Sequence, residues 1–249
     1  MKLDWNLSLA FCKACMVAAL SATPAPSEPP TAPAQAVQFI PNESQHLPTL
    51  KREIESHWPS LTFRAALAGQ VQQETCPSLR SKKCWSPTAE LKTEREYGFG
   101  LGQLTVTEKF DNFKEAKKMD KSMVDWTWEN RYRADYQLRT LVLMDRFNWG
   151  KFTWAATDYE RMAFSLVAYN GGIGGVLSDR GVCRTLHSCD ESRWFGHVEH
   201  TSKKAKVAAK GYGKSFFEIN REYPRNILGF RKDRYLGYFA EDAAHYGSH

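Results

Sequence analysis

The 249-residue sequence has no apolar run long enough for a strong transmembrane helix, no internal repeat and few stretches with the alternation of a β-strand. It also lacks the glycine spacing of a phosphate-binding loop and carries no nucleic-acid-binding motif. The seven histidines are scattered and form no convincing His/Asp cluster, which disfavours a zinc amidase. We therefore expect no metal, no other cofactor and no nucleic-acid partner.

What the sequence does contain is typical of a globular protein. Hydrophobic residues make up 42% and aromatic residues 13% of the chain, enough for a sizeable core. The formal net charge of +6 is unevenly spread, because residues 203–234 hold ten Lys or Arg and three acids, a local charge of +7 (10 − 3). Such a segment suits an anionic polymer, for example wall carboxylates, lipid head groups or nucleic acid. An ordinary solvated basic helix explains it equally well.

The first 48 residues differ from the rest of the chain. Residues 1–25 combine a lysine, an apolar stretch and small residues around an A-x-A-like cleavage point, as export signals do, although Asp4 and Lys13 interrupt the pattern. A retained membrane anchor and an unprocessed tail are the alternatives. Residues 26–48 are rich in proline, which favours an extended linker. We therefore predict one folded domain over residues 49–249 of an exported protein of the periplasm or cell envelope.

The six cysteines fall in three neighbouring pairs, one of them within the predicted signal. The other four fit short disulfides formed in an oxidising compartment. Zinc binding is the competing explanation, although the only histidine close by is His187. Four cysteines allow three connectivities, and proximity favours Cys76–Cys84 and Cys183–Cys189.

Helical periodicity dominates the remaining chain, so a mainly α fold with little or no sheet is expected. Ser60 can cap the first strong helix, and Pro77 prevents its continuation. A glycine cluster at residues 171–175 ends another helix. The predicted helices cover residues 61–75, 131–147, 159–170 and 215–235, and a short ribbon is expected around residues 97–107.

One acid occupies an unusual position. Phe63, Leu67 and Val71 repeat at four-residue intervals, and Glu74 follows three residues later on the same apolar stripe. Partial burial and the negative end of the helix dipole both disfavour ionisation, so the pKa of this carboxyl should be raised. A carboxylic acid that keeps its proton near neutral pH can protonate the leaving oxygen of a glycosidic bond. The alternative is a salt-bridged or surface glutamate at a helix end.

Two further segments carry residues suited to binding a sugar. Residues 96–105 are rich in glycine, which lets a backbone approach a bulky ligand, and include Gln103, whose amide can both donate and accept. Residues 168–172 end a helix with Tyr169 and Asn170. The tyrosine ring can stack on a sugar face while its hydroxyl finds a polar partner. Together with Glu74, these residues suggest a site that cleaves carbohydrate.

In this order, the segments resemble the motifs of the lytic transglycosylase family with the soluble-transglycosylase, goose-type-lysozyme-like fold. That family has Glu-Ser at a helix end, then Gly-Leu-Met-Gln, then Ala-Tyr-Asn-Ala-Gly, then a tyrosine in a C-terminal helix. This chain has Glu-Thr at 74–75, Gly-Leu-Gly-Gln at 100–103, Ala-Tyr-Asn-Gly at 168–171 and Arg-Glu-Tyr-Pro at 221–224. It departs from the pattern at Thr75, Gly102 and Gly171, and by a longer insert between the first two motifs.

The resemblance implies a lysozyme-like domain that binds peptidoglycan glycan strands and cleaves the β-1,4 bond between N-acetylmuramic acid and N-acetylglucosamine. Glu74 would act as general acid and then as general base, while the 6-hydroxyl of the sugar closes a 1,6-anhydro ring without consuming water. Thr75 would contact the substrate or merely finish its helix. The other residues that would position the sugar or support the acid are Gln103, Tyr169, Asn170 and Tyr223.

Two alternatives stay open. A hydrolase of the same fold would need a second carboxylate to hold water, for which Glu96 and Glu94 are the candidates. A non-catalytic wall-binding or scaffold module would keep the sugar groove without using the acid.

The departures from the family pattern resemble enzymes of large bacteriophages or of envelope-crossing machines, which would place this chain in host lysis or in such a machine. A membrane-targeted N-terminus would suit either setting.

Overall fold

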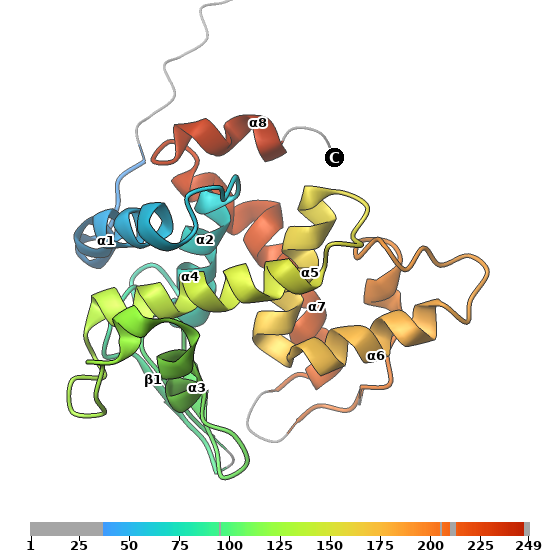
Figure 1. Ribbon diagram of the computed structural model, residues 1–249, viewed down its shortest axis with the longest axis horizontal. Coiled ribbons are helices and arrows are strands. Elements are labelled where there is room, and N and C mark those ends of the chain that lie inside the picture. The colour runs from blue at the N-terminus through green and yellow to red at the C-terminus, as the bar shows by residue number, and fades with distance from the viewer. Residues whose placement is uncertain (1–36, 95, 205, 210–212, 247–249) are drawn as a thin grey trace, which may run out of the picture. The chain divides into compact units, whose positions relative to one another are not determined.

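The computed structural model describes residues 37–94, 96–204, 206–209 and 213–246 (Figure 1). The predicted signal and the first part of the predicted linker lie outside the described residues. The described chain is mostly helical, with eight α-helices and one small three-stranded sheet. The predicted mainly α class with little sheet is thus confirmed.

The elements follow one another as a series of helices interrupted once by the sheet. The α-helices are α1 (Pro41–His57), α2 (Arg64–Thr75), α3 (Asn112–Met119), α4 (Ala134–Lys151), α5 (Asp158–Gly171), α6 (Ile173–Cys183), α7 (Phe216–Asn226) and α8 (Ala243–Tyr246). The strands are β1 (Glu90–Lys92), β2 (Tyr97–Phe99) and β3 (Leu104–Val106). Single turns of other helix types are η1 (Lys121–Met123), η2 (Val198–His200), η3 (Ile227–Arg231), η4 (Lys232–Tyr235) and η5 (Ala240–Asp242).

Helix α2 lies at the centre of the main core. The predicted stripe of Phe63, Leu67 and Val71 is buried, but so are most other residues of α2, which explains the weak amphipathic signal of this segment. The helix packs against η3, a π-helical turn, and η4. Gly69 permits this approach, because a β-carbon there would lie 3.1 Å from the backbone nitrogen of Lys232. The helix that carries Glu74 is therefore held firmly by the C-terminal part of the chain.

The start of α2 is capped by distant residues. Sequence alone predicted Ser60 as the cap, and this prediction is wrong, because the helix begins at Arg64 after Phe63 and has no local side-chain cap. Instead, a carboxylate oxygen of Asp242 accepts a hydrogen bond from the Ala65 amide at 2.7 Å. Tertiary contacts from the C-terminus thus satisfy the free amides that a local serine would otherwise serve.

Helix α1 begins inside the segment predicted to be a linker. It starts at Pro41, so the predicted domain boundary at residue 49 falls within the helix. Proline is compatible with the first helical position, and a second one, Pro48, lies inside the helix. Buried Leu47 and Leu50 pack against the main core, and this burial outweighs the preference of a proline-rich segment for an extended chain.

The three other predicted helices are confirmed with shifted ends, as α4, as α5 and as α7 with its continuation through η3 and η4. Helix α5 ends at Gly171, and Gly172 adopts a φ of +79°, as the predicted glycine stop requires. A further helix, α6, begins at once with Ile173 and was not predicted, because its glycines have low helix propensity.

The sheet belongs to a smaller, second core beside α3. Its strands run antiparallel in the order β1-β2-β3, with Gly98 paired to Leu91 on one side and to Thr105 on the other. The predicted ribbon corresponds to β2 and β3. Helix α4 contributes side chains to both cores and so joins them. Residues of the second core include Phe99, Leu104, Phe113, Trp126, Tyr136 and Leu143.

Both predicted disulfides are present, Cys76–Cys84 and Cys183–Cys189. The first follows α2 directly and closes the insert that leads to the sheet. Two disulfides indicate that the protein folds in an oxidising, extracytoplasmic compartment. Among the described residues, no helix is both long and apolar enough to span a bilayer.

Several basic residues of the segment 203–234 form ion pairs with acidic residues of the same chain. Arg221 is buried and pairs with Asp179, and Arg234 pairs with the buried Glu43. Lys204, Lys214 and Arg225 also have acidic partners. These pairs favour a structural role for a large part of the local positive charge.

Candidate active site

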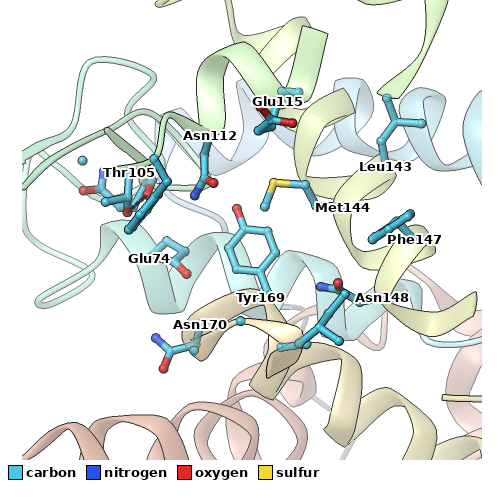
Figure 2. A pocket seen from close by; sticks show the side chains of 18 of the residues that line it. Glu74, Thr105, Asn112, Glu115, Leu143, Met144, Phe147, Asn148, Tyr169 and Asn170 are labelled. Carbon is cyan, nitrogen blue, oxygen red and sulfur yellow. Dashed lines mark hydrogen bonds between the residues drawn. The ribbon is translucent and has the colours of Figure 1, made fainter. Parts of the chain in front are cut away.

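A cavity of about 1610 Å³ lies beside the end of α2 (Figure 2). Its walls come from α2, the sheet, α3, α4, α5 and α7. The sequence-predicted residues Glu74, Thr75, Gln103, Tyr169 and Asn170 all line it, as does Glu96. The fold therefore brings residues of the first three motifs to one cavity, whereas no residue of the fourth motif, at 221–224, lines it.

Glu74 is half-buried on the cavity wall at the last turn of α2. Burial raises the pKa of its carboxyl to about 7, while a hydrogen bond donated by the Tyr223 hydroxyl opposes part of that rise. At neutral pH a large fraction of the molecules thus holds a protonated Glu74. A carboxyl of ordinary pKa would be almost fully ionised. The predicted raised pKa is confirmed, and burial is its main cause.

Tyr169 lies beside Glu74 in Figure 2, with its ring stacked on that of Tyr223 at a centroid separation of 6.5 Å. Its hydroxyl donates a hydrogen bond to the Gly102 carbonyl at 2.7 Å. A β-carbon at position 102 would lie 2.5 Å from that hydroxyl, so a larger residue would displace the tyrosine. Glycine at position 102 therefore leaves the space that the Tyr169 hydroxyl occupies.

Gln103 follows β2 in a tight turn and has a φ of +43°. Its side-chain nitrogen donates to the carbonyls of Gly100 and Ala89, at 2.9 and 3.1 Å. Both amide hydrogens are therefore bonded to backbone carbonyls, one in the turn and one just before β1, and the Oε1 atom is the part of this amide left for a ligand. Gln103 is thus suited to accept a hydrogen bond from a ligand N–H or O–H.

Thr75 and Asn170 differ in how far they reach the cavity. Thr75 is only 2% exposed, and its hydroxyl donates to the Val71 carbonyl and accepts from the Trp85 amide. These bonds fit the predicted alternative in which Thr75 finishes the helix. Asn170 is exposed on the cavity wall, and its Oδ1 atom accepts a hydrogen bond from Asn220 at 3.2 Å.

Several carboxylates besides Glu74 line the cavity. Glu96 does so and is half-buried, whereas Glu94 is exposed and is not part of the lining. Glu90, which sequence reasoning missed, also lines it and accepts hydrogen bonds from Tyr132 and Tyr97. These bonds lower the pKa of Glu90, so this carboxyl is ionised at neutral pH.

Two buried residues near the site were also missed by sequence reasoning. Asp145 on α4 is fully buried, and burial raises its pKa well above the usual range, with the charge of Glu74 adding to the rise. Its place within an apolar helical stripe was the only signal available in the sequence. Asn220 on α7 is 2% exposed and lines the cavity between α5 and α7. No pattern marks it in the sequence, because its role depends on the packing of distant helices.

In the described part of the chain, no group of three or more His, Cys, Asp or Glu residues could hold a metal ion. The sequence matches no protein-family model and no curated protein.

Proposed function

We propose that this protein is a peptidoglycan lytic transglycosylase with a lysozyme-like fold of the soluble-transglycosylase, goose-type class. The observation that carries the proposal is Glu74, an acid with a pKa of about 7 on the wall of a large cavity, bonded by a tyrosine. The order of the four motifs supports the same class. Residues of the first three motifs line this cavity, and Tyr223 of the fourth motif donates a hydrogen bond to Glu74.

In the proposed reaction, the protonated Glu74 gives its proton to the bridging oxygen as the bond from C1 of N-acetylmuramic acid breaks. The N-acetyl carbonyl of that sugar stabilises the cationic centre that forms. The Glu74 carboxylate then takes the proton of the 6-hydroxyl, whose oxygen bonds to C1 and closes the anhydro ring. Proton and charge balance, and Glu74 returns to its starting form.

The surrounding residues suit these two steps. Tyr223 donates to the carboxyl, so it stabilises the carboxylate that exists between them and holds it in place. Tyr169 offers an aromatic ring whose hydroxyl is fixed on Gly102, which limits its movement against a bound sugar. Gln103 and Asn170 provide amide groups of defined polarity on the same wall.

Hydrolysis is the second candidate, because Glu90 and Glu96 line the same cavity. Glu90 is ionised at neutral pH, as a carboxylate that activates water would have to be. Hydrolysis would add water to C1 and leave a reducing end. A wall-binding module without activity would not need a protonated acid in this position.

Product masses distinguish these functions. We expect purified protein incubated with peptidoglycan sacculi to release muropeptides lighter by one water than the corresponding hydrolysis products, which is the mass of the 1,6-anhydro form. Release of reducing-end products alone would establish hydrolysis. Intact sacculi after prolonged incubation, with a known lytic enzyme active in parallel, would contradict both enzymatic functions and favour a binding module.

A further inference from the structure

Two side chains of helix α7, those of Tyr223 and Asn220, contact residues of the candidate site. The Tyr223 hydroxyl donates a hydrogen bond to Glu74, as described above. Asn220 lies about one turn earlier, is buried, and its Nδ2 atom donates to the Oδ1 atom of Asn170 at 3.2 Å. We infer that Asn220 is a positioning residue that turns the amide nitrogen of Asn170 toward the cavity, so that Asn170 binds the acetamido carbonyl oxygen of an N-acetylated sugar. This inference rests on the proposed function for the identity of the ligand.

The orientation of the Asn220 amide follows from its neighbours. Arg221 can only donate, and its Nη1 atom lies 2.8 Å from the oxygen of Asn220. The Val167 carbonyl can only accept, and it lies 3.3 Å from the nitrogen of Asn220. A flipped amide would place donor against donor and acceptor against acceptor. The nitrogen of Asn220 therefore faces α5.

The orientation of Asn170 follows in turn. Since Asn220 offers a nitrogen, Asn170 must offer its oxygen, and its own NH₂ group is left for other partners. Asn170 is exposed and lines the cavity near Glu74 (Figure 2). This position suits a hydrogen-bond acceptor on the ligand, and a carbonyl oxygen is the strongest neutral acceptor that a wall sugar carries.

The support behind Asn220 is rigid. Arg221 is itself buried and donates to Asp179 at 2.8 Å and to the Thr201 carbonyl at 2.6 Å. Asp179 is also buried and bonds Lys204 at 2.7 Å. A buried guanidinium with all these partners has little freedom to rotate, so the asparagine that it holds is preorganised.

Gly171 leaves the space that Asn220 fills. A β-carbon at position 171 would lie 2.5 Å from the Nδ2 atom of Asn220. The alanine usual at this position in the family pattern would therefore push the Asn220 amide away. The departure from the family pattern at Gly171 is thus accounted for, because glycine at this position leaves the space that the Asn220 amide occupies.

The test compares two probes, chito-tetraose with four N-acetyl groups and the same tetramer without them. Both are titrated by calorimetry into protein carrying Glu74→Gln, so that no probe is cleaved. We expect the parent protein to bind the acetylated probe more tightly than the deacetylated one. Asn220→Asp has the same shape but cannot donate, so Asn170 should turn its oxygen toward the cavity, and the ratio of the two affinities should fall about tenfold, the effect of losing one well-made hydrogen bond.

Gly171→Ala gives an independent route to the same result, because the added methyl group displaces the Asn220 amide without changing any polar group. Glu222→Gln on α7, which alters only a surface pair with Lys214, should keep the preference of the parent protein. An unchanged preference in folded Asn220→Asp or Gly171→Ala would overturn the inference, and so would the absence of any preference in the parent protein. Neither result depends on cleavage, so failure of the lytic reaction on sacculi is a separate outcome.

Discussion

Replacing Glu74 by glutamine is expected to lower the rate of muropeptide release from sacculi by about 10³-fold, within the range typical for loss of a general acid. Glutamine keeps the size of the side chain and can still accept the bond from Tyr223, but it has no proton to give at the rate required. The fold and muropeptide binding should persist. The rate is measured as dye release from labelled sacculi, with Glu55→Gln, an exposed acid of α1, as the matched control expected to behave as wild type.

The same variant should also show how much the buried carboxyl of Glu74 lowers the free energy of unfolding at neutral and alkaline pH. The pKa of Glu74 is about 7 when folded and near 4.5 when unfolded, so the folded state binds the proton more tightly. Stability of the wild type therefore falls as the pH rises from 4.5 through 7. At pH 8 we expect Glu74→Gln to be more stable than wild type by about 1–3 kcal/mol, with the difference vanishing near pH 4. Equal stability across this range would mean that the carboxyl is not perturbed.

The largest expected effect on stability is at Glu43. This buried carboxylate accepts hydrogen bonds from Arg234, Tyr235 and the Ile40 amide, and so ties α1 to the C-terminal part of the chain. Glu43→Ala would leave the arginine and the tyrosine hydroxyl without this partner. We expect a loss of about 3–5 kcal/mol in the free energy of unfolding, measured by urea denaturation. Glu55→Ala on the same helix should change it by less than about 0.5 kcal/mol.

The contribution of Glu43 should also depend on pH. Burial alone would raise its pKa, but the bonds from Arg234, Ile40 and Tyr235 outweigh burial and lower it. A group with a lowered folded pKa stabilises the protein above its unfolded pKa of 4.5, and this stabilisation is lost as the pH falls. The gap between wild type and Glu43→Ala should therefore narrow in acid. Stability curves that stay parallel down to pH 3 would contradict this account.

Local sequence signals predicted the elements whose formation is mainly local. The apolar periodicity of α4 and α5 marked these helices, and the helix predicted over residues 215–235 contains α7, whose cap by Ser215 and Glu218 is seen only in the structure. The misses have tertiary causes. Helix α1 depends on burial against the core despite Pro48, and α2 is capped by Asp242 rather than by Ser60.

In the candidate site, too, the sequence predicted the residues that lie in motifs but not the contacts that depend on tertiary packing. The motifs were enough to predict that Glu74, Gln103 and Tyr169 line one cavity, and that Tyr223 contacts the acid. They could not show that Asn220 fixes the neighbouring amide, because that contact joins residues 170 and 220 through helix packing. They also could not show why Gly102 and Gly171 are glycine, since each leaves room for a side chain distant in sequence.

A carbon NMR titration of the Glu74 carboxyl, assigned by the loss of its signal in Glu74→Gln, tests the central claim most directly. We expect a midpoint of about 7 in the wild type. We also expect a higher midpoint in Tyr223→Phe, because that variant lacks the hydrogen bond that favours the carboxylate. A midpoint near the ordinary value of 4.5 would contradict the claim, since Glu74 would then have no proton to give at neutral pH.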